Sequence, residues 1–169
     1  MPSRRERTRK SRRVGVNARI RRALAPTRRV RVPVARPREE VFDYLAEPRH
    51  RPEWQSSLRR VEVLDDGPPA VGMRWVDHTV LGLSFELAIV DMRRAERWVE
   101  EGRSGPFEAR VVLTFDPADE RAVRGTIVGC EVAVRGRGVA RPLGPLATSA
   151  GLVAARSDLR RAARILSRA

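Results

Sequence analysis

The sequence has 169 residues, a length typical of a single domain, and a net charge of +14. Its only cysteine is Cys130, so the chain can form neither an intramolecular disulfide nor a cysteine-based zinc site. A domain of this size buries enough surface to fold without such cross-links. No run of 18 or more apolar residues occurs, so no segment is predicted to span a membrane. We expect a cytoplasmic protein with no cofactor and no metal.

The positive charge is concentrated at the N-terminus. Residues 1–29 contain twelve Arg or Lys and one acidic residue, a net charge of +11, and the other 140 residues carry only +3. This division predicts a disordered basic extension over residues 1–29 and a folded domain over residues 30–169. Residues 4–29 could make a weak contact with nucleic acid or an anionic surface, could be idle, or could reflect a mis-assigned translation start. No aromatic residue lies among these arginines, so the stacking part of single-strand recognition is missing.

The segment after the extension predicts one strand and two short helices. Residues 30–34 alternate as a first strand. Pro37 suits the first turn of a helix whose apolar face includes Phe42 and Leu45, and Pro48 ends it. A second short helix opens at Pro52 and carries Trp54.

Period-two alternation then predicts about six strands, and a long helix closes the chain. The expected strands cover residues 58–65, 73–78, 83–90, a short segment through Trp98 that ends at Gly102, 107–115 and 125–135. Residues 116–119 are expected to form a hairpin loop and residues 136–145 a longer loop. The final helix is expected over residues 147–166, with apolar residues at spacings of three and four and arginines opposite them.

Three local patterns resemble one known family. These are Pro37-x-x-x-Val41-Phe42-x-x-Leu45-x-x-Pro48, then Pro52-Glu53-Trp54, then Val71-Gly72-x-Arg74, with Thr126 and Asp158-Leu159 in the closing strand and helix. Over residues 30–167 the chain resembles the SRPBCC, or START-like, superfamily and its polyketide cyclase/dehydrase and lipid transport group. The resemblance implies an α+β helix-grip fold, in which a curved antiparallel sheet of about six or seven strands wraps around a long C-terminal helix. Two short helices follow the first strand.

The same resemblance implies a cavity between the sheet and the final helix, in which a small hydrophobic molecule such as a lipid or polyketide binds. Apolar residues on the inward faces are the candidates for its wall. They are Trp54, Met73, Trp75, Phe85, Leu87, Trp98, Val111, Leu113, Leu152 and Leu159. Most of these residues could equally be ordinary core.

The candidates for acid–base chemistry are few, and the resemblance supplies no fixed catalytic residue. Asp77 shares the inward face of Met73 and Trp75 but lies at a strand end, where carboxylates are commonly solvated. Tyr44 could place its hydroxyl at the cavity mouth, and His78 is expected on the outward face. His50, beside Arg49 and Arg51, is expected at the surface.

Three functions therefore stay open. The first is binding of a hydrophobic ligand. The second is a polyketide-type cyclase or dehydratase that uses Asp77, Tyr44 or His78. The third is an RNA- or ribosome-associated protein that acts through its basic extension.

Overall fold

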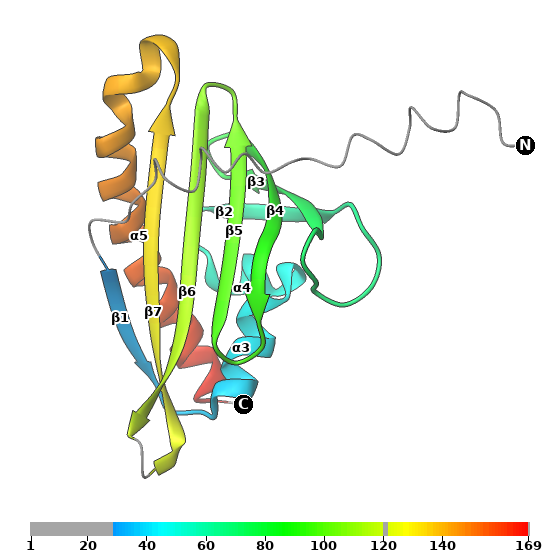
Figure 1. Cartoon of the computed structure of the whole chain (residues 1–169), viewed down its shortest axis with the longest axis vertical. Coiled ribbons are helices and arrows are strands. Elements are labelled where there is room, and N and C mark those ends of the chain that lie inside the picture. Colours follow the sequence, from blue (N-terminus) through cyan, green and yellow to red (C-terminus); the bar gives the residue numbers. More distant parts are fainter. Residues whose placement is uncertain (1–28, 120–121, 169) are drawn as a thin grey trace, which may run out of the picture.

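A computed structural model describes residues 29–119 and 122–168, and Figure 1 shows the arrangement of their elements. Seven antiparallel strands form one curved sheet in the order β1-β7-β6-β5-β4-β3-β2. The strands are β1 (Arg29–Val34), β2 (Leu58–Val63), β3 (Arg74–Thr79), β4 (Ser84–Arg93), β5 (Arg97–Ser104), β6 (Phe107–Asp119) and β7 (Ala122–Gly136).

The described helices lie on one side of this sheet (Figure 1). Helices α3 (Arg38–Ala46), η1 (Pro48–His50) and α4 (Arg51–Trp54) join β1 to β2. Helix η2 (Gly138–Leu143) leads from β7 into α5 (Gly144–Leu166), which packs on β7 and β1 and touches α4. The α+β helix-grip fold expected from the sequence is confirmed. None of the described helices is long and apolar enough to cross a membrane.

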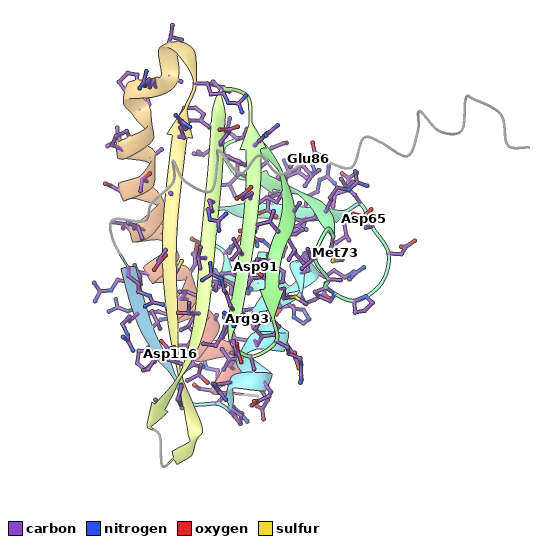
Figure 2. All side chains as sticks on the ribbon, viewed as in Figure 1. Asp65, Met73, Glu86, Asp91, Arg93 and Asp116 are labelled. Atoms are coloured by element: carbon purple, nitrogen blue, oxygen red, sulfur yellow. The ribbon has the colours of Figure 1, made fainter. Side chains whose placement is uncertain are left out.

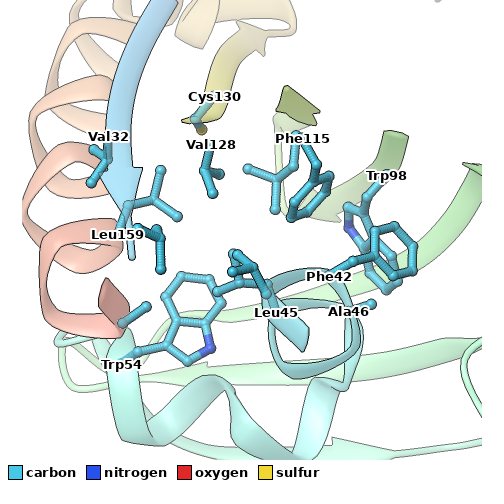
Figure 3. Close-up of a cluster of buried hydrophobic side chains, with 14 of the residues drawn as sticks. Val32, Phe42, Leu45, Ala46, Trp54, Trp98, Phe115, Val128, Cys130 and Leu159 are labelled. Atoms are coloured by element: carbon cyan, nitrogen blue, oxygen red, sulfur yellow. The ribbon is translucent and has the colours of Figure 1, made fainter. Parts of the chain in front are cut away.

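Alternating side chains give the sheet one buried face and one polar face. In β4, Leu87 and Ile89 are buried, and Glu86 beside them is exposed. Polar side chains such as Glu86 and Asp116 lie on the face away from α5 (Figure 2). The buried face meets α3, α4 and α5 in one hydrophobic core, part of which Figure 3 shows. This pattern places apolar strand residues opposite the inner face of the final helix.

The expected hairpin loop at residues 116–119 is wrong, because β6 continues through this segment as a strand. Pro117 pairs with Thr126 of β7, and a register irregularity follows between Pro117 and Asp119. The last β5 partner of β6 is Thr114, so β6 has β7 as its partner strand beyond that point. Proline is tolerated at such a one-sided edge, because its missing N–H would not have donated to a neighbouring strand.

The expected loop over residues 136–145 is also wrong in part, since η2 occupies most of it. A β-carbon on Gly136 would lie 1.9 Å from the carbonyl oxygen of Ala140, so only glycine allows η2 to fold back this closely. Helix α5 begins at Gly144, three residues earlier than expected, and Pro145 in its first turn has no N–H that the helix needs.

The basic extension, apart from its last residue, lies outside the described residues. Its predicted disorder and its predicted contact with nucleic acid or an anionic surface therefore stay predictions. Arg29, which the sequence assigned to the extension, begins β1. Its guanidinium donates to Thr114 Oγ1 at 2.5 Å and lies 3.7 Å from Glu131 Oε1.

Candidate functional site

A cavity of about 260 Å³ lies between the buried face of the sheet and α5. Figure 3 shows Leu45, Trp54, Cys130 and Leu159 turned toward a common centre from α3, α4, β7 and α5. Six of the ten residues proposed from the sequence as ligand contacts line this cavity: Trp54, Phe85, Leu87, Val111, Leu113 and Leu159. The other four, Met73, Trp75, Trp98 and Leu152, are buried in the core and do not line it.

The cavity opens between α5 and the segment that joins α4 to β2. Ser57 of this segment and Ala154 of α5 line the cavity and are exposed, so they mark its mouth. On the α5 side the wall also includes Ala155, whose small side chain leaves room that a larger residue would fill, and Gly151, which lies close against β7. A β-carbon added at Gly151 would already lie 3.0 Å from Val132.

Three charged side chains form a buried ion cluster in the wall of this cavity. Arg51 of α4 donates from Nη1 to Glu100 Oε2 at 2.6 Å and from Nη2 to Glu100 Oε1 at 3.1 Å. Arg51 Nη2 also donates to Asp77 Oδ2 at 2.9 Å. The side chains of Arg51, Asp77 and Glu100 are 4–6% exposed. The cluster therefore ties the short helix α4 to strands β3 and β5 from within.

Two aromatic residues pack against the ion cluster. Trp98 donates from Nε1 to Glu100 Oε2 at 3.1 Å. The guanidinium of Arg51 lies 5.3 Å from the ring centre of Trp75, which fits a cation–π contact. These contacts hold Arg51 and Glu100 in fixed positions beside the cavity.

The surroundings in the cluster shift the pKa values of Arg51 and Asp77. Burial works against a charged guanidinium, but the carboxylates of Glu100 and Asp77 outweigh it and raise the pKa of Arg51. Burial raises the pKa of Asp77, Arg51 opposes this shift, and Glu100 adds to it. Arg51 therefore stays a cation, and Asp77 takes up a proton more easily than a free aspartate does.

Asp77 also keeps one unused acceptor. Its Oδ1 atom is buried and has no hydrogen-bond partner among the described residues. The indole of Trp75 acts to lower the pKa of Asp77, although Trp75 Nε1 is buried and makes no hydrogen bond of ordinary length and angle with the described residues. Trp54 Nε1 and Arg51 Nε, both of residues that line the cavity, are two further buried polar atoms without a partner among the described residues.

The other two acid–base candidates lie outside the cavity lining. Tyr44 donates its hydroxyl to Glu53 Oε2 at 2.8 Å, and its ring stacks on His50 with 4.9 Å between centres. Burial and the neighbouring Glu53 raise the pKa of Tyr44. His78 lies in a separate groove beside Arg59 and Arg60, where its ring contacts Ser84 Oγ at 3.0 Å and Glu62 Oε2 at 3.3 Å. Of the three candidates, Asp77 alone lines the cavity.

Neither Arg51 nor Glu100 was among the site residues predicted from the sequence. Arg51 belongs to a run of basic residues in a predicted surface turn, yet it is 5% exposed. Asp77, expected to be solvated at its strand end, is 4% exposed because Arg51 covers it. The alternation of Trp98, Glu100 and Gly102 on one face of β5 was a usable signal, since it places Glu100 beside a buried tryptophan.

Asp158 of α5 is another buried carboxylate on the cavity wall. Its Oδ1 accepts from Ser56 N at 3.1 Å and from Ser56 Oγ at 2.8 Å, so it holds the segment that joins α4 to β2 against α5.

The part of the chain that the structure describes contains no group of three or more His, Cys, Asp or Glu side chains that could hold a metal ion.

Several solved structures share this fold. DR_A0006 from Deinococcus radiodurans is 26% identical, and the match covers 80% of this chain and 93% of that chain with a TM-score of 0.56. The hypothetical protein jhp0584 from Helicobacter pylori is 14% identical, with 81% and 85% covered and a TM-score of 0.66. DynU16, a putative protein in the dynemicin biosynthetic locus, is 20% identical over 82% of this chain but only 46% of its own, with a TM-score of 0.57.

No curated protein matches the sequence. A family model does match: polyketide cyclase / dehydrase and lipid transport, over residues 26–168. This match covers most of the chain and every described strand and helix. The chain belongs to the polyketide cyclase/dehydrase and lipid transport family.

Proposed function

We propose that the protein binds a small hydrophobic molecule in the cavity between the sheet and α5. The observation that carries this proposal is the cavity itself, whose wall is mostly aliphatic and aromatic and whose mouth reaches solvent at Ser57 and Ala154. Removal of apolar ligand surface from water would supply the affinity, at about 25 cal/mol per Å² buried. A few polar atoms would orient the ligand. The lone thiol of Cys130 is compatible with the cytoplasmic location expected from the sequence.

The size of the cavity favours a compact ligand. Its volume of about 260 Å³ lies just below the usual range for ligand pockets, roughly 300–1,000 Å³. A molecule of one to three rings, or a short acyl chain, fits such a space better than a sterol does. We therefore favour a small aromatic or polyketide-like molecule over a long-chain lipid.

Native mass spectrometry of freshly purified protein tests this proposal. The expected spectrum contains, besides the free protein, a complex whose extra mass is recovered as an apolar compound after extraction with organic solvent. The same protein refolded from denaturant after extraction should lack this complex and should regain it on exposure to the extract. A protein that carries no such mass, and that takes up no apolar probe after refolding, contradicts the proposal.

A second function, polyketide-type cyclisation or dehydration, is supported by one group. Asp77 lines the cavity, and burial raises its pKa, as suits a carboxyl group that exchanges protons with a bound substrate. If this function operates, Asp77→Asn should abolish turnover and leave ligand affinity within a few fold. Tyr44→Phe should retain turnover, because the Tyr44 hydroxyl donates to Glu53 outside the cavity lining.

A further inference from the structure

A row of polar side chains crosses strands β2, β3 and β4 on the face of the sheet that is turned away from the cavity. His78 of β3 is the cross-strand partner of Arg60 on β2 and of Ser84 on β4. Directly opposed residues of antiparallel strands point to the same face and bring their side chains close together. The register of the sheet therefore holds these three side chains next to one another. None of them lines the cavity, so the proposed ligand binding does not use them.

Ser84, His78 and Glu62 form a serine–histidine–glutamate triad on this face. The ring of His78 contacts Ser84 Oγ through Nδ1 at 3.0 Å and Glu62 Oε2 through Nε2 at 3.3 Å. The neutral imidazole with its proton on Nε2 satisfies both contacts, because Nδ1 then accepts from the serine hydroxyl and Nε2 donates to the carboxylate. A hydroxyl that donates to a base, which a carboxylate in turn orients, is the arrangement that activates a serine as a nucleophile.

The triad borders a surface groove of about 370 Å³, which gives a substrate access to it. The serine and the histidine line this groove together with Arg59 and Arg60. Consecutive residues of a regular strand point to opposite faces, but the register of β2 shifts between Leu58 and Arg60. Such a bulge changes the direction of a side chain, which explains how two consecutive arginines reach one groove.

The charges around the triad favour a substrate with a negative group. Arg60 Nη1 donates to Glu62 Oε2 at 3.3 Å, so this arginine and the carboxylate of the triad compensate each other. Arg59 is exposed and forms no ion pair with a residue that the structure describes, so its guanidinium is available to an anion. Glu86, further along the same face of β4, acts on Arg74. Guanidinium N–H groups also suit the negative oxygen that develops during attack on a carbonyl group.

We propose that this groove is a second site, which hydrolyses carboxylic esters that carry a negatively charged group. Ser84 Oγ attacks the ester carbonyl carbon, and its proton passes to His78 Nδ1. The bond from the carbonyl carbon to the leaving alcohol then breaks, and His78 gives the proton to the leaving oxygen. Water attacks the acyl group on Ser84 in the same way, which releases a carboxylic acid and restores the serine. Glu62 touches no reacting atom; it is a positioning residue that orients the ring of His78 and stabilises its positive charge.

Hydrolysis of two matched esters by the full-length protein tests this site. The probes are 4-acetoxybenzoate, which is an anion, and its methyl ester, which is neutral and carries the same acetyl group. The released phenol is measured by chromatography, and each rate is compared with the rate in buffer. Wild-type protein is expected to accelerate both reactions, with kcat/KM about threefold to fivefold higher for the anion, as suits an exposed ion pair. After an acid quench during turnover, peptide mass spectra should show an acetyl group on Ser84.

Two pairs of variants test the nucleophile and the base. Ser84→Ala and His78→Gln should lower kcat/KM about a hundredfold or to the rate in buffer, because a positioned general base contributes roughly 10²–10⁴-fold. Ser149→Ala and His50→Gln are the matched controls and should keep the wild-type rate. Ser149 is exposed on α5, and His50 is the only other histidine of the chain.

Two further variants separate positioning from substrate binding. Glu62→Gln keeps the size of the side chain but removes the charge beside the ring of His78, so kcat should fall about tenfold while KM stays within about twofold. Arg59→Met should raise KM for 4-acetoxybenzoate about threefold and leave KM for the methyl ester unchanged. A purely structural role of either residue would change the kinetics of both esters alike.

Wild-type protein that hydrolyses neither ester faster than buffer overturns the inference, and so does activity that survives in Ser84→Ala. Equal kcat/KM for the two esters overturns the preference for anionic substrates. The rates and the acetyl group on wild-type protein need no variant, so they decide the matter even if a variant does not fold. None of these results bears on ligand binding in the cavity, because no residue of the triad lines it.

Discussion

Cys130 and Asp77 line the same cavity, but their surroundings favour different chemistry. Cys130 is 2% exposed on β7. Burial, with the negative charges of Glu100 and Glu131, raises its pKa to about 12. These surroundings disfavour a thiolate, so the side chain acts as a small apolar part of the wall. At Asp77, by contrast, burial raises the pKa of the carboxyl group, and the positive charge of Arg51 opposes that rise, so the group can still ionise.

The thiol of Cys130 should therefore resist alkylation in the folded protein. A raised pKa means that the reactive thiolate is scarce at about pH 8, whereas the unfolded thiol has its ordinary pKa of about 8.5. Iodoacetamide at this pH should label the native protein at least a hundred times more slowly than the protein in urea, as followed by intact mass. Because the chain has a single cysteine, every adduct reports on Cys130. Equal labelling rates in the two states would contradict the buried position.

Asp77 should leave a signature in the pH dependence of stability. The pKa of Asp77 is higher in the folded state than in the unfolded state. Its contribution to the free energy of unfolding is therefore fully present below the unfolded-state pKa of about 3.9 and is lost as pH rises through the folded-state pKa. The amide that replaces this carboxyl group in the variant Asp77→Asn does not titrate. The free energy of unfolding of wild type minus that of the variant should therefore be larger near pH 4 than near pH 7. Urea unfolding across this range measures the difference.

Asp65 provides a control of opposite sign for this measurement. Its hydrogen bond to Arg74 lowers the pKa of the Asp65 carboxyl group. Its stabilising contribution is therefore present at neutral pH and is lost as pH falls through the folded-state value. For Asp65→Asn, the difference between wild type and variant should shrink toward acid. Equal pH slopes for the two variants would contradict the shifts described for both groups.

At the scale of elements, helix α4 depends on the ion cluster. It has four residues, far fewer than a helix needs to be stable in water, so tertiary contacts must hold it. Arg51 and Trp54 supply such contacts, the first to strands β3 and β5 and the second to the core. Because the same two residues line the cavity, the shape of the cavity depends on the docking of α4.

Arg51→Met should destabilise the protein severely, because it leaves the carboxylates of Asp77 and Glu100 buried without a counter-ion. The expected loss is about 3–5 kcal/mol in the free energy of unfolding at neutral pH, measured in urea. Arg49→Met is the matched control two residues away. Arg49 is exposed and pairs with Glu47 at 2.9 Å, and such surface pairs contribute about 1 kcal/mol or less. A similar loss in both variants would show that Arg51 does not hold the cluster together.

The sequence predicted the elements better than the contacts between them. Alternation identified the inward faces of the strands, and the proline positions bounded the two short helices, because both are local properties of the chain. The extent of β6 was missed, because residues 116–119 read locally as a turn and only pairing with β7 makes them a strand. The ion cluster was missed for a similar reason, since Arg51 lies 26 residues from Asp77 and 49 residues from Glu100. No periodic pattern connects such distant positions.

At the scale of the whole molecule, the cavity follows from the way the layers are arranged. Helix α5 packs on β7 and β1 at one edge of the sheet, and α4 meets both α5 and β2 near the other edge. Between these two edges the curved sheet faces the helices, and β3 to β7 all contribute residues to the cavity wall. The space is open because α5 presents Ala154 and Ala155 toward it instead of large side chains.

A larger side chain at one position of α5 should therefore remove binding without loss of stability. Ala155 is half-buried and lines the cavity, so the larger side chain of Ala155→Leu would fill part of the space that a ligand needs. Affinity for a small aromatic probe such as 2-methylnaphthalene should fall at least tenfold in isothermal titration calorimetry. The added methyl groups leave water, so the free energy of unfolding should stay constant or rise by about 1 kcal/mol.

Ala150→Leu makes the same substitution on the exposed side of the same helix, outside the cavity lining. Helix propensity changes equally in the two variants, so the comparison isolates the effect of filling the cavity. Ala150→Leu should bind the same aromatic probe like wild type. If Ala155→Leu also retains full affinity, the ligand lies elsewhere on the molecule. If Ala155→Leu loses both affinity and stability, that position is already packed, and the cavity does not offer the room that ligand binding requires.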